Sequence, residues 1–397
     1  MDAASRLGLA GFSATAVTFG PARNGYGLFL PDIREEFGLS TEVLGFVASG
    51  LYAGYLAALL AVGLLAARTG PRLPVLAGLL SAGVGTALVA LSPNPAVLAV
   101  GVVLAGTGAG WSWAPYNDAV GLTVPACSRD RVLSAISTGT TFGIAVVGLA
   151  ALAAANYGLP WRAAWFAFAA GSLAVAALNA ALLPRAPASE GKAKTFGWPG
   201  LGWFWCAASA PLFGVALSFG VVNAVYWSFA VDLVSSAAGS SAATGPLLYV
   251  ALGVFGFAGL LTGDAVARFG LGRTLAATLV SLGVAAGLLG LAPGSLAAVA
   301  ASAALFGAGV MTMSALLSVW SSAVFRERPS AGFSAALLLF GVGGIAGPAA
   351  AGSAADQYGL GKVFIFVAAL AISTVLIRPE RGSGPRAPRS RTGAGRV

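Results

Sequence analysis

Apolar runs of about 20 residues, separated by short segments that carry charges, prolines or glycines, follow one another along most of the chain. A helix needs about 20 apolar residues to cross a hydrocarbon core of ~30 Å, and the bilayer tolerates only a backbone whose polar groups are paired internally. The pattern therefore predicts an all-α membrane protein whose first helix is retained and is not a cleaved signal peptide. We predict twelve transmembrane helices, at residues 8–30, 43–66, 73–91, 96–117, 134–156, 161–183, 203–230, 244–267, 271–291, 295–321, 333–355 and 361–377.

The composition agrees with a bilayer as the solvent of this chain. Of the 397 residues, 58% are hydrophobic and only 9% are charged, whereas soluble domains carry about 25% charged residues. Two cysteines and no histidine leave no zinc ligand set and no Ser-His-Asp triad. No phosphate-binding loop of the ATPase type occurs in the sequence either. We therefore expect no enzyme, no cofactor and no metal site.

The basic residues predict how the helices are oriented. If the N-terminus is cytoplasmic, Arg34, Arg162 and Lys362 fall in outer loops, Arg23 falls inside a span, and the other 18 of the 22 lysines and arginines fall in inner segments. This positive-inside bias predicts that both termini lie in the cytoplasm. The overall style of the sequence indicates a prokaryotic protein, for which we expect the inner (plasma) membrane. The basic tail at 378–397 is expected to be disordered and to serve orientation, not nucleic-acid binding.

An internal repeat divides the chain into two halves. At an offset of 200 residues, segment 19–33 matches segment 219–233 at five positions, among them Asp32 and Asp232. We predict two pseudo-symmetric six-helix bundles with the substrate site between them, near the membrane midplane. The predicted parts are an N-terminal bundle at 1–183, a cytoplasmic linker at 184–202, a C-terminal bundle at 203–377 and the tail at 378–397.

Two loops share the pattern Gly-x-x-x-Ala-Arg-x-Gly, one after the second span and one after the eighth. With the repeat, this pattern resembles the signature of the major facilitator superfamily, and the resemblance covers nearly the whole chain apart from the tail. It implies a transporter in which one bundle rocks against the other. In that family an aspartate stands where this chain has Ala67 and Ala267, so we expect Asp118 to pair with Arg68 instead. The predicted gating residues are Gly63, Arg68, Gly70, Asp118, Gly263, Arg268 and Gly270.

Other segments narrow the resemblance. Residues 26–40 are similar to the first helix and following loop of monocarboxylate and other small-anion carriers in this superfamily, which implies an organic anion as substrate. The glycine run at 106–110 lacks the arginine that precedes it in proton antiporters, so proton antiport through that group is not expected. The glycine-rich fifth and eleventh spans are interpreted first as close helix packing, with a hinge role as the alternative.

Arg23 is the only basic residue that lies deep inside a predicted span, because Arg162, Arg273 and Lys362 stand within two residues of the start of theirs. A charge inside the membrane costs ~2.5–3.5 kcal/mol on insertion scales, and no acidic residue shares the helical face of Arg23. The guanidinium is therefore suited to a carboxylate ligand, which it can bind with two hydrogen bonds. The alternative is an arginine that snorkels outward or is paired structurally. The predicted substrate-binding residues are Phe19, Arg23, Tyr26, Trp113, Tyr116, Asn117, Asn223, Tyr226, Met313 and Trp320. Packing is the alternative role for each aromatic side chain among them.

The leading hypothesis is a monomeric secondary transporter of a small organic anion, such as a monocarboxylate, with membrane lipid and a small-molecule substrate as its partners. A coupling proton, an exchanged anion or uniport all remain open. The second hypothesis is an exporter of amphipathic or aromatic compounds, favoured if the cavity is large and apolar and Arg23 points away from it. A membrane receptor that transports nothing is the third.

Overall fold

The structure is a computed structural model, and it describes residues 2–183, 209–327 and 329–379. The predicted linker at 184–202 and the tail beyond Pro379 lie outside the described residues, as do the side chains of residues 64, 66–68 and 329–331. All regular elements of the described part are helices. The domain boundaries proposed from the sequence therefore stay predictions where they fall in these gaps.

The first transmembrane helix is interrupted, and the five helices after it are continuous. It consists of α1 (Ala3–Phe19), a π-helical turn η1 (Gly20–Asn24) and α2 (Gly25–Leu28), and the short polar helix α3 (Leu30–Phe37) follows it. The rest of this half comprises α4 (Thr41–Thr69), α5 (Arg72–Leu91), α6 (Pro95–Thr123), α7 (Ala126–Asn156) and α8 (Trp161–Leu182).

The second half begins, in the described part, with α10 (Ser209–Ser235). Its eighth transmembrane segment is also irregular, because a 3₁₀ turn η2 (Phe257–Leu261) joins α11 (Thr244–Gly256) to α12 (Thr262–Phe269). The remaining elements are α13 (Leu271–Leu291), α14 (Leu296–Val324), α15 (Pro329–Tyr358), α16 (Leu360–Ser373) and the turn η3 (Thr374–Leu376).

Ten helices of the described chain are long and apolar enough to cross a membrane, and Leu360–Leu376 is a shorter apolar one. The interrupted first helix brings the number to the predicted twelve, so the predicted all-α, twelve-helix membrane fold is confirmed. Several helices extend beyond their apolar runs. The fifth span was predicted to begin at residue 134, whereas α7 begins at Ala126, because a helix can continue past the hydrocarbon core into the polar zone.

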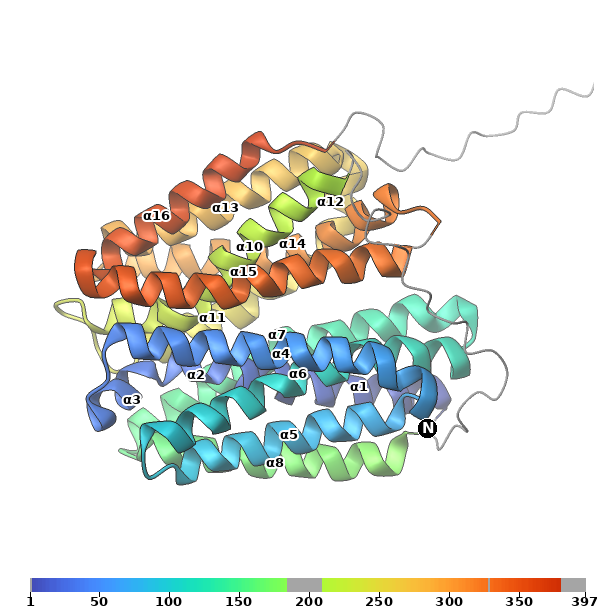
Figure 1. The fold of residues 1–397 in the computed structure, drawn as a ribbon, viewed down its shortest axis with the longest axis horizontal. Coiled ribbons are helices and arrows are strands. Elements are labelled where there is room, and N and C mark those ends of the chain that lie inside the picture. The colour runs from blue at the N-terminus through green and yellow to red at the C-terminus, as the bar shows by residue number, and fades with distance from the viewer. Residues whose placement is uncertain (1, 184–208, 328, 380–397) are drawn as a thin grey trace, which may run out of the picture.

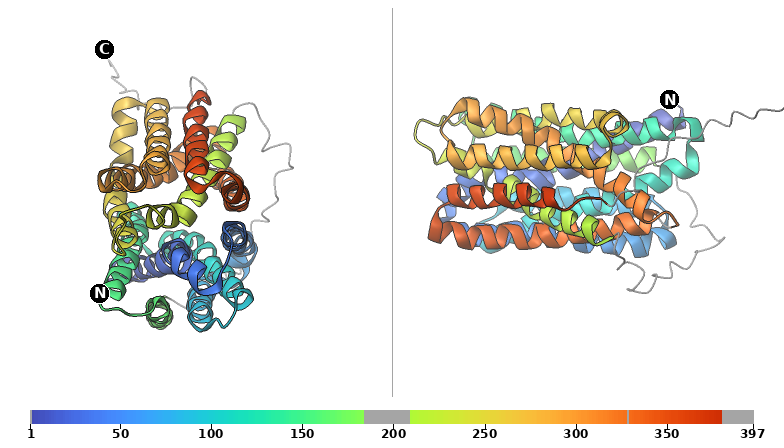
Figure 2. Two further views of the ribbon diagram at one scale, coloured as in Figure 1. Left: turned by 90° about the vertical axis from the view of Figure 1, so that its left-hand side faces the viewer. Right: turned by 90° about the horizontal axis from the view of Figure 1, so that it is seen from above.

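The two halves form two bundles that lie side by side. In Figure 1 the N-terminal half, blue to green, lies below the C-terminal half, yellow to red, and Figure 2 shows the same separation from the end. Across the interface, α4 packs on α15 and α7 packs on α11. We call the end of the molecule that carries α3 "the α3 end" and the opposite end, where Ala3 lies, "the N-terminal end".

The bundles approach each other most closely near the α3 end. A Cβ atom on Gly27 of α2 would overlap the carbonyl oxygen of Trp227 of α10, and one on Gly45 of α4 would overlap that of Pro348 of α15. Gly27 and Trp227 are also aligned by the 200-residue repeat, which is expected where a pseudo-two-fold axis passes between the bundles. Figure 1 shows α4 and α15 diverging toward the N-terminal end.

Candidate substrate site around Arg23

Arg23 lies in the π-helical turn that interrupts the first transmembrane helix. Pro21 has no amide hydrogen to donate to the preceding turn, which favours a departure from α-helix here. The Asn24 side-chain amide donates to the Phe19 carbonyl at 2.8 Å and stabilises the turn. A π turn adds one residue to the helix and is frequent at functional sites.

Four aromatic rings surround the guanidinium of Arg23. Its Cζ atom lies 4.3 Å from the ring centroid of Tyr55, 5.3 Å from Tyr52, 5.5 Å from Phe19 and 5.8 Å from Phe340. A cation within about 6 Å of a ring centroid is attracted by the negative face of the ring. We call these four rings the Arg23 cage. Phe340 belongs to α15 and the others to the N-terminal bundle, so both bundles contribute to the cage.

No acidic side chain of the described residues lies within 4.0 Å of the Arg23 guanidinium, because the two ion pairs found there involve other arginines. Arg23 is half-buried. The rings attract its charge, but ring faces do not accept the N–H groups at the edge of a guanidinium as a carboxylate does. The Tyr52 side chain also hydrogen-bonds with Arg23, but no carboxylate of the described residues pairs with the guanidinium.

Two further aromatic residues lie next to the cage: Trp113, which was predicted to bind substrate, and Phe219, the repeat counterpart of Phe19. Trp113 of α6 meets Phe19 edge-on, with ring centroids 6.3 Å apart. Phe219, the repeat counterpart of Phe19, packs on Phe340 at 5.3 Å. Of the residues predicted from the sequence to bind substrate, the structure thus gathers Phe19, Arg23 and Trp113 in one place.

Tyr26 and Tyr116 make hydrogen bonds inside the N-terminal bundle. The Tyr26 hydroxyl donates to the Leu44 carbonyl at 3.0 Å, and the Tyr116 hydroxyl hydrogen-bonds with the Asn179 side chain. In a regular α-helix Tyr26, three residues after Arg23, would lie on the same face as Arg23. The extra residue of the π turn changes the register after it, and the ring of Tyr26 is not among those that surround Arg23.

The predicted residues of the C-terminal bundle are buried within that bundle. The Asn223 side-chain oxygen accepts from the Trp227 indole N–H at 3.1 Å, and Tyr226 stacks on Phe306 with centroids 3.5 Å apart. Met313 and Trp320 are fully buried, whereas Asn117 of α6 is exposed. None of these contacts tests substrate binding, so their proposed roles stay predictions.

An ion pair joins the two bundles at the α3 end. Arg34 Nη2 of α3 lies 2.7 Å from Asp232 Oδ2 of α10, and the Asp232 side chain is only 7% exposed. The carboxylate of Asp356, on α15, accepts the first backbone amides of α4, from Thr41 at 3.2 Å and Glu42 at 3.1 Å. These contacts connect α3 and α4 to α10 and α15, so they stabilise the closed arrangement of this end.

A second ion pair at the same end lies within one bundle. Arg162 Nη2 of α8 is 2.6 Å from Glu36 Oε1 of α3, and the Trp161 indole N–H donates to the same carboxylate at 2.7 Å. The hydrogen bond from Arg162 holds the pKa of the Glu36 carboxyl below its usual value. Because both partners belong to the N-terminal bundle, this pair does not oppose separation of the bundles.

A serine of one bundle inserts its hydroxyl into a helix of the other. Ser49 of α4 donates to the Ile345 carbonyl at 2.6 Å and accepts from the Ala349 amide at 2.9 Å. These two backbone groups stand four residues apart on α15, as the partners of a helical hydrogen bond do, and they flank Pro348. Pro348 has no amide hydrogen for the Gly344 carbonyl and disturbs the helix at this point, and the Ser49 hydroxyl bonds to both groups of the next pair along the helix.

The predicted gating loops form equivalent turns in the two halves. Gly70 and Gly270 both have positive φ, at 71° and 83°, and no atom outside their own helices lies near Gly63 or Gly263. Arg268 is exposed and lies over the Phe269 ring at 5.3 Å. The side chain of Arg68 lies outside the described residues, so its pairing with the exposed Asp118 stays a prediction.

Three members of the cage, Tyr52, Tyr55 and Phe340, and the inter-bundle ion pair were not predicted from the sequence. Tyr52 and Tyr55 stand three residues apart on one helix, a spacing that puts both on one face, and this signal was present in the sequence. Phe340 and the Arg34–Asp232 pair carried no such signal. They come from segments more than a hundred residues apart, which only the packing of the two bundles brings together.

A family described as "Uncharacterised MFS-type transporter YbfB" matches residues 15–378 of the chain. No curated protein sequence matches this chain. Among solved structures, the nucleoside transporter NupG has the same fold, with a TM-score of 0.74, 14% identity, and coverage of 95% of this chain and 98% of that chain. A bacterial homologue of the human lysosomal transporter Spinster, in an inward-facing and unoccupied conformation, has a TM-score of 0.72, 16% identity and coverage of 94% of each chain. Identities this low establish the fold alone, whereas the family match covers nearly the whole chain. This protein belongs to the YbfB-type family of major facilitator superfamily transporters.

Proposed function

We propose that this transporter carries a small organic anion, such as a monocarboxylate, across the inner membrane, with Arg23 as the group that binds the anion. The observation that carries the proposal is a half-buried guanidinium between two bundles that has aromatic partners but no acidic partner among the described residues. An intramembrane charge without a counter-ion is expensive, which favours a functional role for it.

The surroundings of Arg23 suggest which anions suit it. The edge of the guanidinium can bind a carboxylate with two parallel hydrogen bonds, while the rings of Tyr52, Tyr55 and Phe340 offer apolar surface beside it. A carboxylate with an apolar or aromatic body would use both features. A small, strongly hydrated inorganic anion would use only the charge.

The cage also suggests how binding is linked to movement. Phe340 moves with the C-terminal bundle, and Arg23 moves with the N-terminal bundle, so rocking of the bundles changes the surroundings of the anion. With the termini in the cytoplasm, as the basic residues predict, the α3 end faces outward, and the closed ion pair there corresponds to an inward-facing state. One chain supplies the whole cage, which is consistent with a monomer. Uniport, exchange and proton cotransport are all compatible with this arrangement.

The test is thermal stabilisation of the purified protein by pairs of ligands that differ only in charge, such as benzoate with benzamide and lactate with lactamide. A ligand that prefers the folded state raises the melting temperature. We expect one carboxylate to stabilise the protein more than its amide, and the Arg23→Gln variant to lose that difference. Arg162→Gln is the matched control, because Arg162 also lies over aromatic rings but already has Glu36 as partner. Equal stabilisation of the protein and the Arg23→Gln variant would refute the anion site.

The second candidate is export of amphipathic or aromatic compounds. It is favoured by the number of rings at the site, four around Arg23 with Trp113 behind them. If Arg23 is satisfied by these rings, then neutral aromatic ligands should stabilise the protein as well as charged ones, and Arg23→Gln should leave their effect unchanged. Binding of a ligand without flux in proteoliposomes would indicate a receptor instead.

A further inference from the structure

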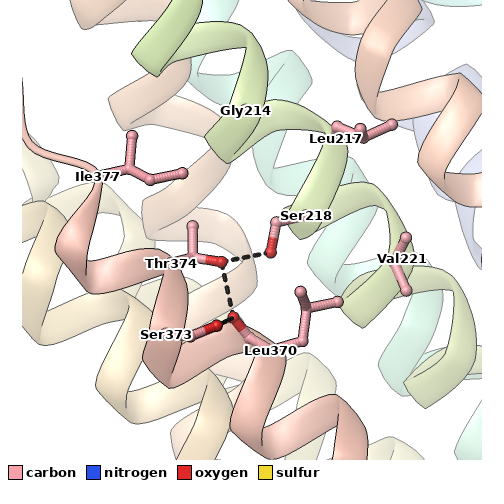
Figure 3. Close-up of a pocket in the computed structure, with 8 residues that line it drawn as sticks. All are labelled: Gly214, Leu217, Ser218, Val221, Leu370, Ser373, Thr374 and Ile377. Atoms are coloured by element: carbon pink, nitrogen blue, oxygen red, sulfur yellow. Dashed lines mark hydrogen bonds between the residues drawn. The ribbon is translucent and has the colours of Figure 1, made fainter.

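A pocket of about 320 Å³ lies on the C-terminal bundle and shares no residue with the Arg23 cage. Figure 3 shows that its walls come from two helices, α10 on one side and α16 with the turn η3 on the other. The lining residues are Gly214, Leu217, Ser218, Val221, Leu370, Ser373, Thr374 and Ile377.

The polar atoms of this pocket are already paired with one another. The Ser218 and Thr374 hydroxyls lie 2.6 Å apart, and both Thr374 and Ser373 donate to the Leu370 carbonyl, at 2.7 Å and 2.9 Å (Figure 3). The other walls are leucine, isoleucine and valine side chains and one glycine. A guest in this pocket therefore meets apolar surface and no group that requires a polar partner.

The pocket faces away from the other bundle. Its outer wall, α16, packs on α10, α13 and α15, all of the same bundle, and Figure 1 shows α10 between α15 and α16 on this flank. On this flank Leu370, which lines the pocket, is 36% exposed, and Leu376, the neighbour of the lining residue Ile377, is 81% exposed. Large apolar side chains exposed on the periphery of a membrane protein face lipid, so the pocket opens to the bilayer.

Two arginines flank the pocket at the N-terminal end. Ile377 lines the pocket, with its Cδ1 atom 3.3 Å from where a Cβ atom on Gly214 would lie, and the next residue is the exposed Arg378. Pro379 then reaches the start of α13, where its Cδ atom is 4.0 Å from the Cβ position of Gly272. Gly272 is followed by Arg273, which is also exposed. Positive charge thus stands beside an apolar pocket that opens to the bilayer.

We propose that this pocket binds an acyl chain of an anionic phospholipid, whose phosphate lies between Arg378 and Arg273. The apolar walls bury the chain by the hydrophobic effect, and the two guanidinium groups attract the headgroup. The positive-inside bias predicts that this end faces the cytoplasm, and anionic lipids give a bilayer surface a negative potential that attracts basic residues. The proposal does not depend on which solute the protein transports.

The test uses the full-length protein, delipidated in detergent, with phosphatidylglycerol and phosphatidylcholine of identical acyl chains. Native mass spectrometry counts bound lipids, and the melting temperature reports their effect. We expect phosphatidylglycerol to bind more tightly than phosphatidylcholine. Arg378→Gln should weaken phosphatidylglycerol binding roughly fivefold, the effect of one basic residue near a lipid headgroup. Arg131→Gln is the matched control, because Arg131 is exposed at the same end of the other bundle.

Two substitutions test the pocket itself. Gly214→Leu and Ser373→Phe fill it from opposite walls, and both should abolish the tightly bound lipid while the protein stays monodisperse in gel filtration. Having two such variants keeps the test valid if one of them fails to fold. Unchanged lipid binding in the pocket variants would overturn the proposal. An equal loss in Arg131→Gln would overturn it in favour of general attraction to the basic surface, and an equal effect of glycerol phosphate would show that no acyl chain is required.

Discussion

Removing the charge of Asp232 should open the α3 end of the transporter. Asp232→Asn keeps the shape of the side chain and one oxygen that can accept from Arg34, but it loses the charge of a bond that is 2.7 Å long and almost buried on the Asp232 side. Hydrogen bonds to charged groups contribute about 1.5–3 kcal/mol, roughly twice the contribution of neutral ones. Because Arg34 is 35% exposed and can be hydrated in part, we expect a loss near the lower end of this range, about 1.5 kcal/mol. That loss raises the ratio of open to closed molecules roughly tenfold.

The assay is a distance measurement between spin labels placed on opposite bundles at the α3 end. Tyr157, at the end of α7, and Leu291, at the end of α13, are suitable because both are about four-fifths exposed, and both native cysteines are first replaced by serine. We expect a longer distance to gain population in Asp232→Asn. Glu36→Gln should change nothing, because its ion pair with Arg162 lies within one bundle.

The combined exchange Arg34→Asp with Asp232→Arg should return part of the short distance, since it restores an ion pair across the interface. Distances in Asp232→Asn that match those of the unsubstituted protein would refute the view that this pair holds the α3 end closed. A shift of equal size in Glu36→Gln would refute it as well, because a general loss of charge at this end would then explain the result.

Substitutions at four other positions test the closed interface and the predicted gate. Ser49→Ala removes two hydrogen bonds to α15 and should favour the open α3 end by about 2 kcal/mol, read from the same label pair; no shift would contradict the bridging role of the hydroxyl. Gly27→Ala places a methyl group against the Trp227 carbonyl, so the closed distance should be nearly lost while the protein still inserts in the membrane; a normal closed population would show that the backbones can yield. Reversing the charge of either Arg68 or Asp118 should reduce transport of the stabilising carboxylate in proteoliposomes, and exchanging both should restore part of it; absence of rescue would count against this gate pair.

The fold could be predicted because each of its features follows from a local pattern in the sequence. Apolar runs of membrane length predict helices wherever they occur, since the α-helix is the regular backbone that pairs all its polar groups within a single segment in lipid. The 200-residue offset predicts the two bundles, and the aligned pair Gly27 and Trp227 does meet at their interface. The turns at Gly70 and Gly270, both with positive φ, also repeat as the sequence pattern indicates.

The candidate site was only partly predictable, because helical periodicity fails where the helix is irregular. Arg23 stood out by its charge alone, and Phe19, one turn before it, does lie against it. Beyond the π turn at Gly20–Asn24 the register changes, and Tyr26 instead bonds to the Leu44 carbonyl. The individual residues at 19–26 do not show where the helix takes up the extra residue of the π turn. The close packing of neighbouring helices also affects that position.

The sequence by itself determined that this chain spans a membrane with twelve helices in two related halves and that it carries one basic residue, Arg23, deep inside a span. These properties follow from composition, run length and repetition, which are local. The tertiary structure decided what surrounds that charge and what holds the halves together. The ring of Phe340 near Arg23, the Arg34–Asp232 ion pair and the insertion of Ser49 into α15 each join residues about 200 to 320 positions apart in the chain. Such pairs depend on how two bundles are rotated and spaced against each other, and that arrangement is set by the sum of many packing contacts.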